Sequence, residues 1–254
     1  MEQISIDMIL FLAGAGFIAS FIDSVVGGGG LISLPALLVT GLPPTVALGT
    51  NKMASVMGSC TSTLSFLRSG KINIAIIKYL FPLSFIGSAF GVIAVQQIPS
   101  QFLKPLVVIM LVAVTLYTFT KRDWGTVSTY NGMTQKTAYL SGIIAFLIGF
   151  YDGFFGPGAG SFFIFAFLMI GFDFVVAAGN SKALNFASNI AAVLTFIYFG
   201  SINYYYAVPM GISMILGALA GSRLAIKKGA AYVRPLFLLV SVLLISKQLW
   251  DVLH

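Results

Sequence analysis

The sequence is poor in charged residues, histidine and cysteine. Only 8% of its 254 residues are charged and 58% are hydrophobic, whereas a soluble domain carries roughly 25% charged residues. Such a chain cannot form a water-exposed surface, so most of it must lie in lipid. The single cysteine, Cys60, excludes an intramolecular disulfide. The single histidine, His254, leaves almost no material for a histidine metal site or for Ser-His or Cys-His catalysis. These absences predict a polytopic membrane protein that is not an enzyme and needs no metal or cofactor.

The formal net charge of +7 is not read as a sign of nucleic-acid binding. The basic residues cluster in short loops between apolar stretches, which is how orientation is encoded in a membrane protein. Residues 1–7 lack the basic leader and the small-residue cleavage site of a secretory signal, so we expect the first apolar segment to stay as a helix. The partners expected are the lipid bilayer and a small anionic substrate, with no nucleic acid.

Apolar segments follow one another along the whole chain. They are 6–26, 31–40, 45–67, 74–96, 105–120, 137–155, 161–171, 175–199, 204–222 and 235–250. A spanning helix needs about 20 residues, so 31–40 and 161–171 are too short to cross alone. Each follows a glycine-rich break. We therefore predict an all-α protein in which each half opens with a broken, re-entrant hairpin and continues with three spanning helices.

The two halves of the chain repeat one pattern. Asp23 precedes Gly27–Gly30, and half a chain later Asp152 precedes Gly156, Pro157, Gly158 and Gly160. Nearly the same offset aligns Gly41 with Gly171, Gly49 with Gly179, Lys52 with Lys182, Gly87 with Gly217 and Gly91 with Gly221. Duplicated apolar halves with matching breaks are typical of transporters and point to the binding site. We predict a first repeat over 1–120, a linker loop over 121–136 and a second repeat over 137–254, together one membrane domain.

The charges of the loops predict how the halves are oriented. If each hairpin returns to its starting side, one side of the membrane receives Arg68, Lys71, Lys78, Lys121, Arg122, Lys136, Arg223, Lys227, Lys228 and Arg234. The other side then holds Lys104 and Lys247, beside the acidic Glu2 and Asp7. Without the return, the loop cations would divide almost evenly. The positive-inside rule favours the return, which places both termini on the non-cytoplasmic side and makes the repeats inverted.

One lysine in each half lies inside apolar sequence. A lysine within the bilayer costs roughly 2.5–3.5 kcal/mol on insertion scales, although a long side chain near a helix end can snorkel to the interface. Here polar residues follow at helical spacing, which favours a lined cavity. Lys52 is followed by Ser55, Ser59 and Thr63, and Lys182 by Asn185 and Asn189.

The glycine breaks supply a second element of a candidate site. Helices beginning at the breaks would present unpaired N–H groups and the positive end of the helix dipole inside the membrane, which suits an anion. Gly28, Gly29, Gly30 and Gly158 would let backbone approach the ligand closely. The alternative is that these glycines only allow tight helix packing. Together with two lysines, the breaks predict a small anion as substrate.

Asp23 and Asp152 are the acids that lie well inside apolar sequence, each four residues before its break. One hypothesis is proton coupling, with a carboxylate titrating during the transport cycle. The other is that each carboxylate caps the following half-helix or pairs with a lysine. The sequence leaves both open.

At these residues the chain resembles the sulfite exporter TauE/SafE family. The resemblance rests on Asp23 to Gly30, Pro35, Ala47 to Lys52, Gly156 to Gly160 and Gly179 to Lys182, and it covers essentially the whole chain. It implies a duplicated helical transporter of the inner membrane that moves, as an exporter, sulfur-containing anions such as sulfite or an organosulfonate like sulfoacetate. By position, it implies that Asn51, Lys52, Ser181 and Lys182 contact the substrate.

The hypothesis that follows is a secondary transporter working by alternating access between the halves. An anion channel with the same positive lining is an alternative, as is a permease for another small oxyanion or carboxylate. An intramembrane enzyme ranks last, because no convincing nucleophile–base pair is present. Whether the protein forms a homodimer is left open.

Overall fold

The structure is a computed structural model that describes residues 6–99, 101–102, 128–132 and 134–229. Every regular element in these ranges is an α-helix. The helices are α1 (Ile6–Val26), α2 (Gly30–Val39), α3 (Pro44–Arg68), α4 (Ile74–Gln96), α6 (Gln135–Phe154), α7 (Ala159–Met169), α8 (Phe174–Tyr198) and α9 (Tyr204–Lys228). The predicted all-α class is confirmed for the described residues.

Four helices, α1, α4, α6 and α9, are long and apolar enough to cross a membrane. The predicted short segments are also present, as α2 with 10 residues and α7 with 11. The helices α3 and α8 contain the two lysines and have 25 residues each. At 1.5 Å per residue, the length of each helix exceeds the thickness of the hydrocarbon core, which is about 30 Å. The predicted segments 105–120 and 235–250, and part of the linker, lie outside the described residues.

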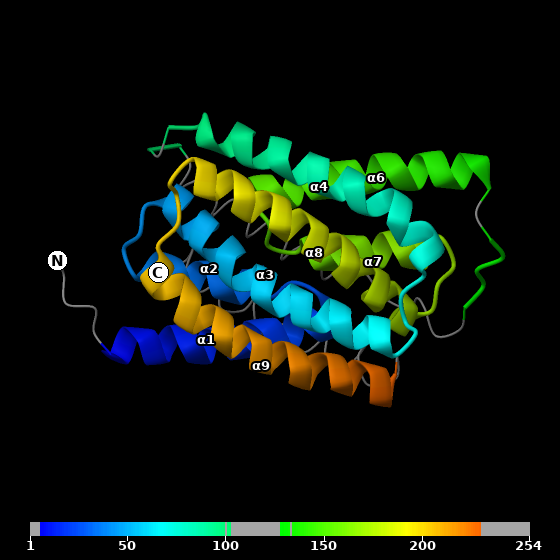
Figure 1. The fold of residues 1–254 in the computed structure, drawn as a ribbon, viewed down its shortest axis with the longest axis horizontal. Helices are drawn as coiled ribbons and strands as arrows, with labels where there is room; N and C mark the ends of the chain where they lie inside the picture. The colour runs from blue at the N-terminus through cyan, green and yellow to red at the C-terminus, as the bar shows by residue number, and fades with distance from the viewer. Residues whose placement is uncertain (1–5, 100, 103–127, 133, 230–254) are drawn as a thin grey trace, which may run out of the picture.

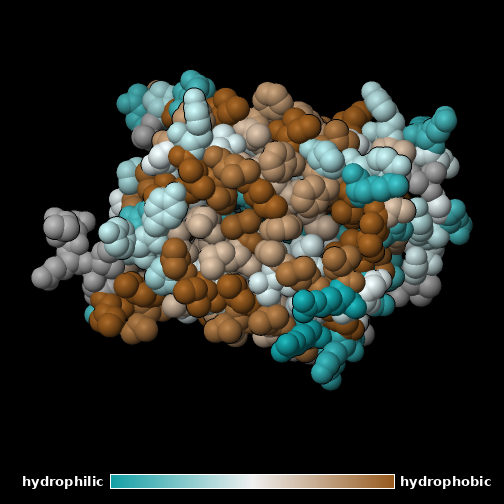
Figure 2. Space-filling view, in the orientation of Figure 1, coloured by the Kyte–Doolittle hydropathy of each residue, from teal (hydrophilic) through white to brown (hydrophobic). Residues whose placement is uncertain are grey.

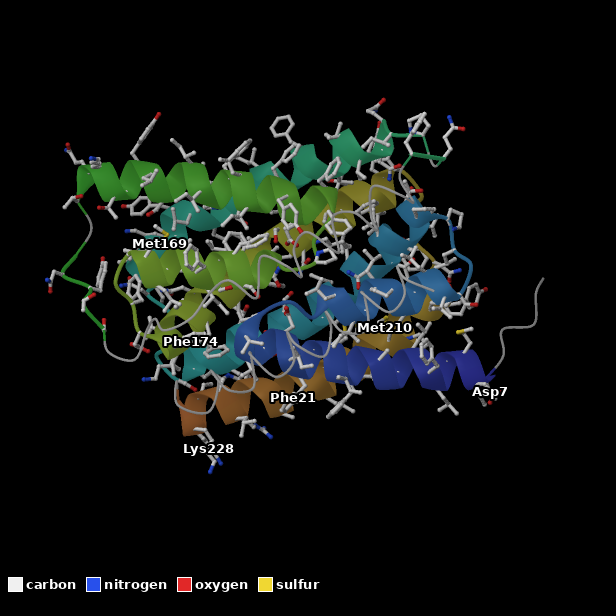
Figure 3. All side chains as sticks on the ribbon, turned by 180° about the vertical axis from the view of Figure 1, so that it is seen from behind. Asp7, Phe21, Met169, Phe174, Met210 and Lys228 are labelled. Atoms are coloured by element: carbon white, nitrogen blue, oxygen red, sulfur yellow. The ribbon has the colours of Figure 1, made fainter. Side chains whose placement is uncertain are left out.

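The matching helices of the two halves run in opposite directions. In Figure 1, α1, α3 and α9 run from left to right, whereas α4, α6 and α8 run from right to left. Viewed from behind, Asp7 and Lys228 lie at opposite ends of the bundle (Figure 3). Arg68, Arg223 and Lys227 line one shared groove at the Lys228 end. Several of the basic residues that the loop charges placed on one side therefore do share one end of the molecule.

Glycines set how closely the helices pack. The helix α1 lies along α9, and α4 lies along α6. In both contacts, a Cβ added to a glycine would fall on a backbone carbonyl of the neighbouring helix, so only glycine fits. These contacts are Gly87 with Phe146, Gly91 with Phe150, Gly217 with Phe17 and Gly221 with Phe21. Small residues give lipid-embedded helices this close approach.

The helices α3 and α8 pack against each other, α3 also against α9 and α8 also against α4. Figure 2 shows hydrophobic residues across the middle of the visible face and hydrophilic ones gathered toward its ends. Buried positions on α8, by contrast, include Asn180, Lys182, Asn185 and Asn189. An apolar face over buried polar side chains is what a helical bundle in lipid with polar residues at its core would show.

Candidate functional site

The candidate site includes the two breaks, where the backbone has positive φ angles that favour glycine. Gly27 and Gly28 have φ of +74° and +91°, and Gly156 and Gly158 have φ of +101° and +85°. L-residues with a side chain rarely adopt this region. The chain can therefore leave α1 and turn at once into α2, and leave α6 and turn into α7. The predicted unwinding at the glycines is confirmed.

The two breaks touch each other inside the molecule. The hydroxyl of Ser161 donates to the carbonyl of Val26 at 3.0 Å. A Cβ added to Gly30 would lie 2.9 Å from Pro157 Cα, so the backbones of the two breaks are almost in contact. Residues that are half a chain apart in sequence thus form one structural unit.

Lys52 on α3 forms an ion pair with Asp152 on α6. Its Nζ lies 2.6 Å from Asp152 Oδ1, and the two side chains are only 3% and 2% exposed. The ammonium also donates to Asn189 Oδ1 at 3.1 Å. The second carboxylate oxygen, Oδ2, accepts from Asn185 Nδ2 at 3.1 Å and from the hydroxyl of Ser188. Each charge thus has a counterion and further hydrogen bonds, as a buried pair requires.

Lys182 on α8 forms the corresponding pair with Asp23 on α1. Its Nζ lies 2.6 Å from Asp23 Oδ2, the lysine being fully buried and the aspartate 24% exposed. Asp23 Oδ1 also accepts from the backbone N–H of Gly29 at 3.2 Å. The hypothesis that the carboxylates pair with lysines is confirmed for both, and Asp23 also holds the backbone of Gly29, the residue just before α2. Each pair joins one half of the chain to the other.

A small polar cavity lies between the breaks and the polar faces of α3 and α8. Its lining consists of Ala19, Ser20, Asp23, Gly28, Gly29, Gly30, Ser33, Asn51, Lys52, Ser55, Ser59, Asp152, Gly156, Gly158, Gly160, Asn185, Asn189 and Met214. The space open to the centre of a water molecule is about 30 Å³. At roughly 10–15 Å³ for each water, two or three waters fill it. The cavity is a chamber for a small ligand and not a wide pore.

Asn51 stands out among the lining residues. Its side chain is almost completely buried, yet its Oδ1 has no hydrogen-bond partner among the described residues. Leaving a buried polar atom unpaired costs about 1–3 kcal/mol. The backbone N–H groups of Gly28, Gly158 and Gly160 likewise meet no acceptor in the described part of the chain. The cavity therefore offers hydrogen-bonding groups that a polar ligand can satisfy.

Most of the residues predicted as ligand contacts line this one cavity. They are Gly28, Gly29, Gly30, Asn51, Lys52, Ser55, Gly158, Asn185 and Asn189, together with the two acids Asp23 and Asp152. Two predicted contacts are not in the lining. The hydroxyl of Ser181 donates to the Gly160 carbonyl at 2.8 Å, and Lys182 lies behind its partner Asp23. In this conformation, the lysine that lines the cavity is Lys52.

Sequence reasoning missed Ser188, whose hydroxyl holds Asp152, and Ser20 and Met214 of the lining. Ser188 could have been found, because it lies three residues after Asn185 on the same helix face. Ser20 and Met214 carry no such signal, since they come from α1 and α9. Among the described residues, no group of three His, Cys, Asp or Glu side chains could hold a metal ion.

Comparison with known proteins gives a consistent family. The family model "Sulfite exporter TauE/SafE" matches residues 12–247. The chain is similar to "Probable membrane transporter protein ORF9" of Sinorhizobium sp, at 39% identity over 100% of this chain and 97% of the relative. It is similar to a "Probable membrane transporter protein" of Haemophilus influenzae, at 37% identity over 98% and 97%. It is also similar to YfcA of Escherichia coli K12, at 36% over 92% and 87%. No solved structure matches.

Proposed function

The chain belongs to the sulfite exporter TauE/SafE family of membrane transporters, and from this premise we propose that it carries a small sulfur-containing anion across the inner membrane by alternating access. Sulfite and organosulfonates such as sulfoacetate are the substrates proposed, and export is the direction. The description of the family supports a sulfur compound as the substrate. The geometry of the site supports a small anion.

The observation that carries the proposal is the set of groups gathered at the cavity. Lys52 brings an ammonium group to the lining, and the N-termini of α2 and α7 begin at the two breaks that form its wall. Helix N-termini and free backbone N–H groups stabilise anions. Asn51 also lines the cavity, where its amide N–H can donate to an anion, whereas its unpaired Oδ1 accepts and needs a donor other than the anion. A sulfur oxyanion, with several acceptor oxygens on one small centre, can accept from the ammonium and the N–H groups together.

Glycines of the second break bring its backbone close to both lysines. A Cβ on Gly156 would lie 2.9 Å from Lys52 Nζ, and a Cβ on Gly160 would lie 3.4 Å from Lys182 Nζ. A larger residue at Gly156 would therefore displace the Lys52 ammonium group.

We propose that the halves are inverted repeats. Supporting this, matching helices run in opposite directions (Figure 1), and contacts between the halves recur in matching form. The N–H of Asn73 donates to Asn180 Oδ1 at 2.8 Å, and the N–H of Asn203 donates to Thr50 Oγ1 at 2.9 Å. Inverted repeats supply two related conformations, in which the site opens to one side and then to the other.

Orientation follows from the basic end of the bundle. Because cytoplasmic loops of membrane proteins carry the excess of lysine and arginine, the end that holds Arg68, Arg223 and Lys227 is assigned to the cytoplasm. Asp7 lies at the other end (Figure 3). The N-terminus is accordingly proposed to be outside the cytoplasm. The same is proposed for the C-terminus from the predicted crossing of segment 235–250, which lies outside the described residues.

The test is a binding and flux screen on purified protein in liposomes. Methanesulfonate, sulfite, sulfate, thiosulfate, sulfoacetate and taurine are offered, with small carboxylates as competitors. We expect saturable exchange of a sulfur anion, lost in Lys52→Met and kept in the control variant Lys227→Met, whose lysine lies at the basic end. If Lys52→Met binds the anion as tightly as the wild-type protein does, the proposed site is wrong. Currents at ion-channel rates reject the carrier, and stronger competition by carboxylates rejects the sulfur substrate class.

A further inference from the structure

We propose that Asp152 takes up one proton for each anion that binds at Lys52, so that a monovalent anion and a proton cross together without net charge. The inference rests on the proposed function, since it names the second species carried by the same site. It follows from the balance of charge in the cavity and from the difference between the two ion pairs.

The buried site is neutral before any substrate arrives. Its charged groups are Lys52 and Lys182, each paired with an aspartate of the other half. The ionisable residues in the described lining are Asp23, Lys52 and Asp152, so no lysine is left over for an incoming anion. An anion added to a neutral, buried site leaves one uncompensated negative charge. Several kcal/mol is the usual magnitude for such a charge, and one proton removes it.

The polar groups in contact with Asp152 come from α3 and α8. Lys52 on α3 faces it directly. Asn185 and Ser188 on α8 hold its Oδ2. Lys182, on the same helix, is occupied by Asp23 of α1. On its own helix, the hydroxyl of Tyr151 donates to the Pro157 carbonyl at 2.6 Å and is not used by Asp152. Lys52 is therefore the only cation in direct contact with Asp152 among the described residues.

Asp152 and not Asp23 is the proton carrier because of what each lysine faces. Lys52 is in the cavity lining, so an anion binding there competes with Asp152 for the ammonium. Asp152 is then left buried without its counterion. Lys182 is outside the lining, and its partner Asp23 is 24% exposed. Asp23 can keep both its lysine and its charge while the substrate binds.

The proposed exchange conserves protons at Lys52, Asp152 and water. The ammonium of Lys52 keeps its three protons and replaces its hydrogen bond to Asp152 Oδ1 by one to a substrate oxygen. Oδ1 gains a proton from water on the side where the site is open. Oδ2 stays held by Asn185 and Ser188, so the carboxyl group does not move away. On the far side, the anion leaves, Oδ1 returns its proton to water, and the ion pair forms again.

This coupling determines the anion gradient that balances a given proton gradient at equilibrium. For one proton per monovalent anion, the anion ratio at equilibrium equals the inverse of the proton ratio, about tenfold for each pH unit. An outside that is more acidic by one unit therefore opposes export until the internal anion concentration exceeds the external one by about tenfold. Export then removes an anion that has accumulated, and stops before the internal pool is exhausted.

The test uses proteoliposomes and methanesulfonate, a monovalent anion that stays ionised throughout. With the lumen one pH unit more alkaline, we expect about tenfold accumulation in the lumen, unchanged when a membrane potential is imposed with potassium and valinomycin. Asp152→Asn is expected to lose this accumulation while still exchanging labelled for unlabelled anion. Asp173→Asn is a matched control, because Asp173 caps α8 away from the cavity and Asn caps equally well.

A second measurement needs no variant. Calorimetric binding of methanesulfonate to the wild-type protein, in two buffers of different ionisation enthalpy, gives the number of protons taken up, and one is expected. Zero protons, or wild-type accumulation that follows the potential and ignores the pH gradient, overturns the inference while leaving the transport function in place. Absence of any exchange by the wild-type protein counts instead against the proposed function, and the inference falls with it.

Discussion

Removing one partner of the Lys52–Asp152 pair should destabilise the protein far more than removing both. The two side chains are 2.6 Å apart and 3% and 2% exposed, so the values for buried pairs apply without a discount for solvent. Leaving one buried charge alone costs about 3–5 kcal/mol, whereas replacing a whole pair by apolar residues of similar volume is close to neutral. Lys52→Met and Asp152→Leu should each lose about 3 kcal/mol or more. The double variant should recover most of that loss.

The assay is a double-mutant cycle in the free energy of unfolding, measured by titrating the purified protein from mild detergent into SDS. The expected coupling energy between Lys52 and Asp152 is about 5 kcal/mol, because two single losses of about 3 kcal/mol each become a loss of only about 1 kcal/mol in the double variant. The same cycle on Lys182 and Asp23 should give a smaller value, because Asp23 is 24% exposed and water screens its charge. A Lys52–Asp152 coupling within about 0.5 kcal/mol of zero would refute the buried ion pair.

Three further predictions test packing, ligand contact and orientation. Gly91→Leu should lose at least about 3 kcal/mol of stability in the same titration, because its side chain would collide with the Phe150 carbonyl on α6. Asn51→Ala should keep its stability within about 0.5 kcal/mol, since Oδ1 has no partner to lose, but should bind the anion about tenfold more weakly by calorimetry, because the cavity loses the amide N–H that can donate to an oxyanion. A cysteine at Ser69 should react with an impermeant maleimide from the cytoplasmic side, and a cysteine at Gly41 from the opposite side.

Each of these has a matched control. Gly14→Leu should be tolerated, because Gly14 is exposed and no atom lies within 4 Å of its added Cβ. Asn185→Ala should instead lose stability, since Asn185 donates to Asp152. The labelling uses a Cys60→Ser background. Equal stability of the two leucine variants would contradict the glycine packing. A destabilised Asn51→Ala would contradict its assignment as a ligand contact. Labelling of both cysteines from one side would contradict the inverted orientation.

Much of the architecture is encoded locally and could be read from the sequence. The helices α2 and α7 were predicted as short segments, since a run of ten apolar residues cannot cross a bilayer and glycines precede each. The sequence also singles out Lys52 and Lys182, because a charge inside an apolar helix is costly unless it has a role, and both are buried in ion pairs. Such features depend on residues within one or two helical turns, and that information is present in a single sequence.

Some of the site could not be predicted, because it depends on distances between helices remote in the chain. Asn51 and Ser181 occupy matching positions, yet Asn51 lies in the cavity without a partner for its Oδ1 while Ser181 bonds to Gly160. Ser20 and Met214 enter the lining only because α1 and α9 pack closely through glycine. The spacing of residues along one helix does not predict contacts with residues of another helix.

The sequence by itself determined that this is a helical membrane protein with two glycine breaks and two lysines inside apolar segments, because hydropathy, glycine and the position of a lysine act through the local chain and the bilayer. Only the tertiary structure decided that Lys52 pairs with Asp152 and Lys182 with Asp23. That choice depends on how the two halves pack, since each ammonium must find a carboxylate within hydrogen-bond distance in a medium that screens charge poorly. The packing brings the partner from the other half of the chain.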